Sequence, residues 1–265
     1  MVRILKKIYK KLKRINQWQP KLSPIDNLIR IGTAYGSWVI HEKLLDNTSV
    51  CYLAGAGEDI SFDVGLAEKY NSQIFIFDPT PRAKKHFDRL IEATGKNEKM
   101  LIHKNHSDYY DLKTANIGLL HFREIGLWSK EDEIKFYTPK NPEHVSHSAL
   151  NLQKTDEYFV AKVYRLSEVM KMEGHREIDL LKIDIEGAEY AVIDSIVEDK
   201  LKVKMLCVEY DESYNPLDND YHKRIRASIE KLIDYGYVVI DSDLQHNYTF
   251  VLKETYQELL KYNKK

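Results

Sequence analysis

The stretch VCYLAGAGEDISFDVGLAEKY, residues 50–70, has the pattern of a buried strand, a glycine turn and a helix. Glycines allow positive φ and let the backbone pass close to a ligand, and the helix that follows offers its free N–H groups. Such a turn usually suits phosphate, yet Glu58 and Asp59 follow it directly. Taken alone, the turn can be purely structural, since tight strand-to-helix turns also occur without a ligand. If it binds a ligand, the two acids disfavour a phosphate.

Apolar runs and helical patterns alternate on both sides of this turn. We expect strands at residues 50–55, 73–78, 118–125, 179–184 and 204–210, with helices between most of them. Apolar residues recur on one stripe in 185–198 and again in 219–235, as in helices that cover a sheet. This order predicts a mostly parallel sheet with helices on both faces.

The end of the chain departs from this order. YGYVVIDSDLQHNYTFVLK, residues 235–253, gives two strands joined by a short polar loop, which must be antiparallel. Between about 120 and 165 the pattern changes to short β-like pieces, which we interpret as an insertion. The predicted fold is α/β: a doubly wound, mostly parallel, seven-stranded Rossmann-like sheet that ends in an antiparallel hairpin. That is the arrangement of class I methyltransferases.

The length of the chain and its hydrophobic content of 43% favour one domain, over residues 26–265. Forty Lys and Arg balance forty-one Asp and Glu, which argues against a dedicated nucleic-acid-binding protein. Cys51 and Cys207 lie in apolar runs without metal-site spacing, so we expect buried thiols in a reducing compartment. No apolar run approaches the roughly twenty residues of a membrane helix. We expect a cytoplasmic protein.

Residues 1–25 form a separate segment with a basic, amphipathic pattern. Ile4, Ile8, Leu12 and Ile15 lie near one helical face, and seven Lys or Arg occur in the first fifteen residues. Such a helix can rest on anionic lipid at the inner face of a membrane. We favour the alternative that it docks its apolar stripe on its own domain or frays.

A second informative segment is QIFIFDPTPRAKKHF, residues 73–87. It ends a strand with Asp78, about twenty residues beyond the glycine turn, where an acid accepts hydrogen bonds from the two hydroxyls of a ribose. Pro79 and Pro81 stop the strand, and Thr80 can cap the next helix. Asp78 can alternatively be a capping residue alone. With the glycine turn at this spacing, we favour a nucleoside site.

The third segment is DLLKIDIEGAEYAVIDSI, residues 179–196. Asp184 and Glu186 are two residues apart at the end of a strand, so both side chains can face one crevice. Acids in a first helical turn favour the helix dipole, which explains Glu186 or Glu189 without function. It does not explain Asp184 at the tip of a buried strand.

Within that segment, LLKIDIEGAEYAVI (residues 180–193) resembles the characteristic motif of FkbM-family methyltransferases. The resemblance extends over roughly residues 48–252 through AGAGEDISFD, FDPTPRAKKHF, EIGLWSKEDEIKFY, SHSALNL and the EY pair at 209–210. Many relatives have an early Asp in the first strand and a GANxG turn, whereas this chain has Cys51 and GAGED. These departures indicate a distinct branch.

The resemblance implies S-adenosyl-L-methionine as the cofactor, and methylation of a hydroxyl on a sugar, a glycan or a related natural product. This cofactor has no phosphate and carries an ammonium and a sulfonium, so acids beside the turn are tolerated. The cofactor residues implied are Gly55, Ala56, Gly57, Glu58, Asp59, Asp78, Pro79, Thr80, Gly126 and Leu127. The last two would border the adenine.

For catalysis, Asp184 is the expected base that removes the proton of the acceptor hydroxyl. Glu186 would orient it or accept a substrate hydroxyl, and Glu209 would complete an acidic wall. His147 and Ser148 are expected substrate contacts. We assign no metal site, although clustered carboxylates can raise one pKa or bind a divalent ion.

Two other classes of function share part of this pattern. A nicotinamide-dependent Rossmann oxidoreductase has the glycine turn and the ribose acid, but the acids at 58 and 59 and the terminal hairpin speak against it. A non-catalytic nucleoside-binding module would keep the fold without the reaction. The expected partner is a saccharide or another hydroxyl-bearing acceptor, with no nucleic acid. The sequence leaves the oligomeric state open.

Overall fold

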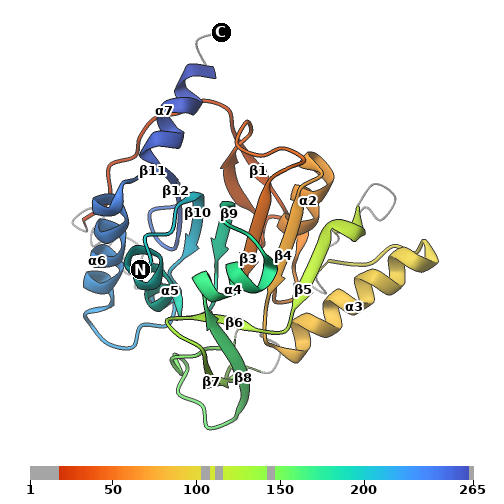
Figure 1. Ribbon diagram of the computed structural model, residues 1–265. Coiled ribbons are helices and arrows are strands. Elements are labelled where there is room, and N and C mark those ends of the chain that lie inside the picture. Colours follow the sequence, from red (N-terminus) through yellow and green to blue (C-terminus); the bar gives the residue numbers. More distant parts are fainter. Residues whose placement is uncertain (1–17, 103–107, 111–115, 142–146, 263–265) are drawn as a thin grey trace, which may run out of the picture.

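A computed structural model describes residues 18–102, 108–110, 116–141 and 147–262 (Figure 1). Within these residues the central sheet has seven strands in the order β11-β12-β10-β9-β3-β4-β5. Their bounds are β3 Val50–Ala54, β4 Gln73–Phe77, β5 Leu120–Arg123, β9 Ile178–Ile183, β10 Val203–Glu209, β11 Tyr237–Ser242 and β12 Asn247–Leu252. The five strands from β10 to β5 run parallel, and β12 is antiparallel to both of its neighbours. The predicted sheet and its terminal hairpin are confirmed.

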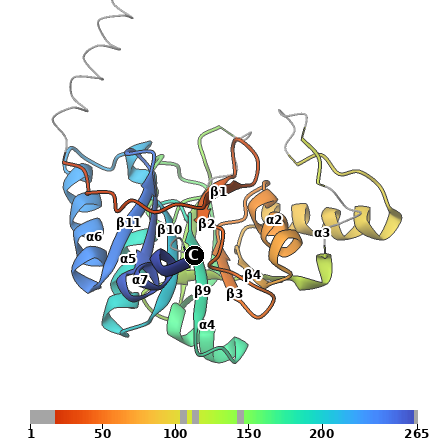
Figure 2. The ribbon, with the colours of Figure 1, turned by 90° about the horizontal axis from the view of Figure 1, so that it is seen from above.

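Side-chain alternation along the strands builds a core on each face of the sheet. In β3, Cys51 and Leu53 join one buried cluster, and Tyr52 and Ala54 join the other. The first cluster is covered by α2 (Ser61–Tyr70), α3 (Pro81–Lys96) and α7 (Lys253–Tyr262). The second is covered by α4 (Leu166–Glu173), α5 (Glu189–Glu198) and α6 (Tyr221–Tyr235). Seen from above, α2 and α3 lie beside β4 at one end, and α5 and α6 beside β10 and β11 at the other (Figure 2).

The predicted insertion forms a second, smaller sheet. Strands β6 (Gly126–Trp128), β7 (Asp132–Tyr137) and β8 (Tyr158–Arg165) pair in the order β6-β8-β7 and lie beyond one end of the main sheet (Figure 1). The strand expected at 118–125 is therefore shorter than predicted. A 3₁₀ turn (Ile117–Leu119) precedes β5, and the apolar run continues into β6 of the other sheet.

Three further features differ from the expectation. The helix expected from residue 185 begins at Glu189, because Glu186 (φ 54°) and Gly187 (φ 104°) are left-handed and cannot start a helical turn. A hairpin of β1 (Leu28–Ile31) and β2 (Trp38–His41) precedes the sheet, and α7 follows it; neither was predicted. The loop between β1 and β2 lines a cavity at the edge of the sheet.

The cysteines, the N-terminal segment and the described helices bear on three further expectations. Cys51 and Cys207 are buried free thiols, as expected. The basic amphipathic pattern falls largely on residues 1–17, which lie outside the described part of the chain. Among the described helices, none has the length and apolar character needed to cross a bilayer.

Candidate active site

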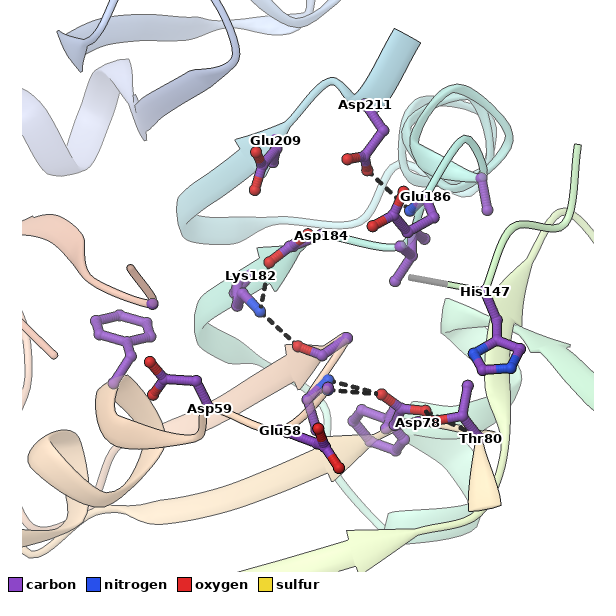
Figure 3. Close-up of a pocket in the computed structure, with 18 of the residues that line it drawn as sticks. Glu58, Asp59, Asp78, Thr80, His147, Lys182, Asp184, Glu186, Glu209 and Asp211 are labelled. Atoms are coloured by element: carbon purple, nitrogen blue, oxygen red, sulfur yellow. Dashed lines mark hydrogen bonds and ion pairs between the residues drawn. The ribbon is translucent and has the colours of Figure 1, made fainter. Parts of the chain in front are cut away.

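Four neighbouring strands, β10, β9, β3 and β4, end at the same edge of the sheet, and a cavity of about 580 Å³ opens there (Figure 3). This volume lies in the range of small-molecule sites. Every predicted cofactor and catalytic residue lines it, as does His147. Ser148 does not. It is buried, and its hydroxyl donates to the carbonyl of Glu186 (2.6 Å), so it supports the wall of the cavity.

The glycine turn after β3 passes against the end of β9. Gly55 has φ 87°, and a Cβ at this position would lie 1.7 Å from the backbone oxygen of Asp184. Gly57 is also left-handed, with φ 53°. Only glycine fits at Gly55, because both the conformation and the space exclude a side chain. The turn and the predicted base are therefore held in direct backbone contact.

Asp78 lines the cavity, and its role in holding a ribose stays a prediction. Its Oδ2 accepts hydrogen bonds from the amides of Ala56 (2.9 Å) and Gly57 (3.0 Å), and its Oδ1 accepts from the amide (2.8 Å) and hydroxyl (2.6 Å) of Thr80. A carboxylate offers about four acceptor positions, so protein donors occupy both oxygens. Asp78 ties the glycine turn to the end of β4. A direct bond to a ribose would displace one of these contacts.

Thr80 caps α3 as predicted, since its hydroxyl accepts from the amide of Ala83 (3.4 Å). The two acids after the turn are also bound by the protein. Glu58 pairs with Arg82 (2.9 Å). Asp59 accepts from the hydroxyl of Thr33 (2.6 Å) and the amide of Ser61 (2.9 Å). Asp59 thereby fastens the β1–β2 loop to the start of α2.

The β1–β2 loop forms a wall of the cavity with residues 34–38. Gly36 packs so closely that a Cβ there would lie 2.7 Å from the Asp59 carboxyl carbon. Tyr35 is 65% exposed, and its pKa is raised to about 12 by burial of its hydroxyl and by the carboxylates of the cavity. Sequence reasoning missed this loop. Two apolar runs around GTAYGS were the signal of a hairpin.

Lys182 is a further residue that sequence reasoning missed. Its ammonium lies 3.0 Å from Asp184 Oδ2 and 2.5 Å from the carbonyl oxygen of Gly55. Burial lowers the pKa of Lys182, but the negative charges of Asp184 and Asp63 outweigh burial and raise it, so the ammonium stays charged. Strand periodicity places Lys182 on the same side as Asp184, which was the available signal. Among the described residues that line the cavity, it carries the one Lys or Arg charge.

Glu186 lies in the predicted crevice, but on a left-handed residue before the helix. Its amide donates to Asp211 Oδ2 (2.9 Å), a contact that the sequence did not suggest. Asp211 follows β10, and burial, with Glu186 next, raises its pKa well above the ordinary value. The ends of β9 and β10 are thus joined through carboxylate-to-backbone contact.

Two carboxyls that line the cavity, those of Glu209 and Asp63, have strongly raised pKa values. Burial raises the pKa of Glu209 to about 9, with Asp184 as the next cause and Lys182 opposing. Burial raises the pKa of Asp63 to about 7, again against Lys182. Asp63 is 3% exposed, and its Oδ1 has no hydrogen-bond partner among the described residues. Glu209 is protonated at neutral pH in this arrangement.

The cavity has two chemically different ends. Gly126 and Leu127 of β6, with Phe77 and Phe136, give an apolar surface beside the residues that follow β4. The carboxyls of Asp184, Glu186, Glu209 and Asp211 lie at the ends of β9 and β10 (Figure 3). A ligand that fits has a flat apolar group at one end and positive charge at the other.

A family model, the methyltransferase FkbM domain, matches residues 59–239. The chain belongs to the FkbM methyltransferase family. It is an S-adenosylmethionine-dependent methyltransferase, which decides against the oxidoreductase and the non-catalytic module. The adenine suits the apolar end, and the ammonium and sulfonium suit the acidic end, so this chain's residues fit the cofactor.

Two solved structures from Methanococcus jannaschii are similar in outline. The fibrillarin pre-rRNA processing protein is 9% identical, with 78% of this chain and 68% of that chain covered and a TM-score of 0.40. TYW2 in complex with AdoMet is 12% identical, with 87% of both chains covered and a TM-score of 0.33. These values are too low to add to the family assignment. No curated protein matches the chain.

No group of three His, Cys, Asp or Glu side chains is placed to hold a metal ion, as far as the described residues extend. The carboxyls of the cavity are instead engaged by backbone amides, hydroxyls, Lys182 and Arg82.

Proposed function

We propose that this enzyme methylates a hydroxyl oxygen of a sugar, a glycan or a related natural product. The observation that carries the proposal is Asp184, which lies at the tip of β9 in the cavity and contacts both the glycine turn and the Lys182 ammonium. An alcohol needs a base to become a good nucleophile, and we assign that task to Asp184. A positioned base contributes about 10² to 10⁴-fold to the rate.

The bound cofactor supplies an electrophilic methyl group, and the chain's own residues do the rest. Transfer is a displacement at carbon, so alignment of the acceptor oxygen is the main task of the protein. Lys182 holds Oδ2 of Asp184, which leaves Oδ1 to accept the proton of the acceptor. The Glu209 carboxyl, which is protonated in the absence of ligand, completes the acidic wall of the cavity. Glu186 borders the same space and would orient the hydroxyl.

The mouth of the cavity supports a polyhydroxylated acceptor. Tyr35 is 65% exposed and Tyr214 is 55% exposed, and both line the cavity with Asn215 and Asn247. Aromatic faces and amide groups together suit the apolar faces and hydroxyls of a sugar ring. His147, whose ring packs edge-on against Phe159 (5.4 Å), would contact the substrate from the small sheet. The carboxylates disfavour an acceptor with negative charge near the reacting hydroxyl, including nucleic acid.

The place of action is part of the same proposal. Two free thiols suit a reducing cytoplasm, and the basic pattern of the first 25 residues suits contact with an anionic membrane surface that presents a lipid-linked saccharide.

Mass spectrometry of cellular glycans and small molecules, with and without the gene, tests the acceptor class. A saccharide that loses the mass of one CH₂ group when the gene is deleted supports the proposal. Reconstitution with Asp184→Asn should then leave the methyl group absent, whereas Asp194→Asn, an exposed residue paired with Lys231, should restore it. Full methylation by Asp184→Asn would contradict the catalytic assignment. Loss of methyl from a non-hydroxyl position would contradict O-methylation.

A further inference from the structure

The carboxyls that line the cavity differ in their hydrogen-bond and ion-pair partners within the chain. The lining contains Glu58, Asp59, Asp63, Asp78, Asp184, Glu186, Glu209 and Asp211. Several are bound by cationic groups or by backbone and hydroxyl donors of the chain, namely Glu58, Asp59, Asp78, Asp184 and Asp211. The chain itself already supplies the partners of these groups. They are poor candidates for a response to the cofactor.

Glu209 is placed differently. It is the last residue of β10, and β10 pairs with β9 in parallel through Val208 and Ile183, so Glu209 and Asp184 leave neighbouring strand ends. Figure 3 shows the two carboxyls extending from adjacent strands at the acidic end of the cavity. The described hydrogen-bond partner of the Glu209 carboxyl is the hydroxyl of Tyr214. Within the described part of the chain, Glu209 therefore has no ion pair like that of Asp184 with Lys182.

We propose that Glu209 is the residue that distinguishes S-adenosylmethionine from its demethylated product by charge. When the sulfonium is bound, the carboxyl of Glu209 releases its proton to solvent. When the neutral thioether of the product replaces the sulfonium, the carboxylate takes a proton back from solvent. The inference rests on the cofactor assignment and not on the nature of the acceptor.

The groups around Glu209 explain why its charge depends on the ligand. Burial opposes the ionisation of Glu209, as do Asp184 and Glu186, whereas Lys182 and the hydrogen bond from Tyr214 favour it. Asp211, whose own pKa is raised well above the ordinary value, and Tyr35, whose pKa is raised to about 12, also border the cavity. Burial, Asp184 and Glu186 prevail, and they raise the pKa of Glu209 to about 9. A positive charge within about 4–6 Å lowers a carboxyl pKa by roughly 1–3 units. A sulfonium bound at such a distance from Glu209 would bring the group to ionisation near neutral pH, and the thioether would not.

The two ligands form a matched pair for the test. Each carries the adenosine, the ammonium and the carboxylate, and they differ by one methyl group and one positive charge. Calorimetric titration at about pH 7.5 in buffers of different ionisation heat counts the protons released on binding. For the wild-type protein we expect S-adenosylmethionine to release several tenths of a proton more per site than S-adenosylhomocysteine.

Glu209→Gln is the matched variant, because the amide resembles the protonated carboxyl and still accepts from Tyr214. In this variant we expect the difference in proton count between the two ligands to fall close to zero. Glu254→Gln, an exposed residue paired with Lys202, should keep the wild-type difference. An equal difference in wild type and Glu209→Gln would overturn the proposal.

Affinity across pH provides a second readout. In the wild type, the preference for S-adenosylmethionine over S-adenosylhomocysteine should rise toward tenfold per pH unit between about pH 6.5 and 8.5. The ammonium groups of the ligands titrate equally in wild type and Glu209→Gln, so the ratio between the two proteins isolates Glu209. Should the variant fail to fold, equal proton release by both ligands in the wild type would by itself overturn the inference. Binding of neither ligand at any pH would overturn the cofactor assignment and this inference together.

Discussion

Asp78→Asn separates a structural role of this residue from a role in holding the ribose. The carboxylate accepts four hydrogen bonds, from the amides of Ala56 and Gly57 and from the amide and hydroxyl of Thr80. An asparagine keeps one oxygen, which can serve the Ala56 and Gly57 amides. Its NH₂ group then faces Thr80, whose hydroxyl can rotate to accept, while the buried Thr80 amide loses its acceptor.

One buried donor without a partner costs about 1–3 kcal/mol. For a chain of this size each kcal/mol lowers Tm by roughly 2–4 °C, so we expect Tm of the cofactor-free protein to fall by about 2–12 °C. Scanning calorimetry without ligand measures this loss. Asp88→Asn, an exposed residue of α3 paired with Lys84, should stay within about 0.5 kcal/mol of wild type. If Tm stays unchanged without ligand while affinity for S-adenosylmethionine falls, Asp78 holds the ribose and the tether is wrong.

Three further expectations concern the same edge of the sheet. Gly55→Ala places a Cβ 1.7 Å from the backbone oxygen of Asp184, at a residue with φ 87°. The strain should lower the free energy of unfolding by about 1–3 kcal/mol or more and abolish cofactor binding. A denaturant titration that gives wild-type stability would contradict this. The pKa of Glu209 in the folded protein, about 9, lies above its ordinary value of 4.5. Its contribution to stability is therefore fully present below about pH 4.5 and is lost as the pH rises toward 9, so Tm of Glu209→Gln should fall less steeply than that of the wild type over this range. Parallel curves of Tm against pH for the two proteins would refute the raised pKa of Glu209. Thr33→Val removes the donor to Asp59 and should speed chymotryptic cleavage after the exposed Tyr35 several-fold, while Thr48→Val, at an exposed turn, should not.

The sheet was predictable because its signals are local and repeated. Buried parallel strands give continuous apolar runs, and the terminal hairpin gives two runs around a short polar loop. The glycine turn, Asp78 and Asp184 each follow such a run, so the sequence alone places them at one edge. Their meeting in one cavity follows from the parallel order of β4, β3, β9 and β10.

The parts that were missed depend on contacts between distant segments. Whether Asp78 binds a ligand or the chain itself depends on the positions of the Ala56 and Gly57 amides, which no spacing in the sequence gives. The helix after β9 was placed too early, because a motif rich in helix formers hides the left-handed Glu186. Lys182 carried a weaker signal, since a charged residue in an apolar strand indicates a buried partner without naming it.

The acids after the glycine turn, which first argued against phosphate, turn out to be only part of the charge pattern. Glu58 and Asp59 are satisfied by Arg82 and by the β1–β2 loop, so they shape the turn more than they attract a ligand. Across the cavity, burial raises the pKa values of Glu209 and Asp63, neighbouring carboxylates add to the rise, and Lys182 opposes it. A site built this way is costly without its ligand, because buried carboxyls repel one another and must hold protons. A cation relieves that cost and an anion increases it. If Glu209 responds to the ligand as proposed, the same arrangement favours the methyl donor with its sulfonium over the product with its neutral thioether.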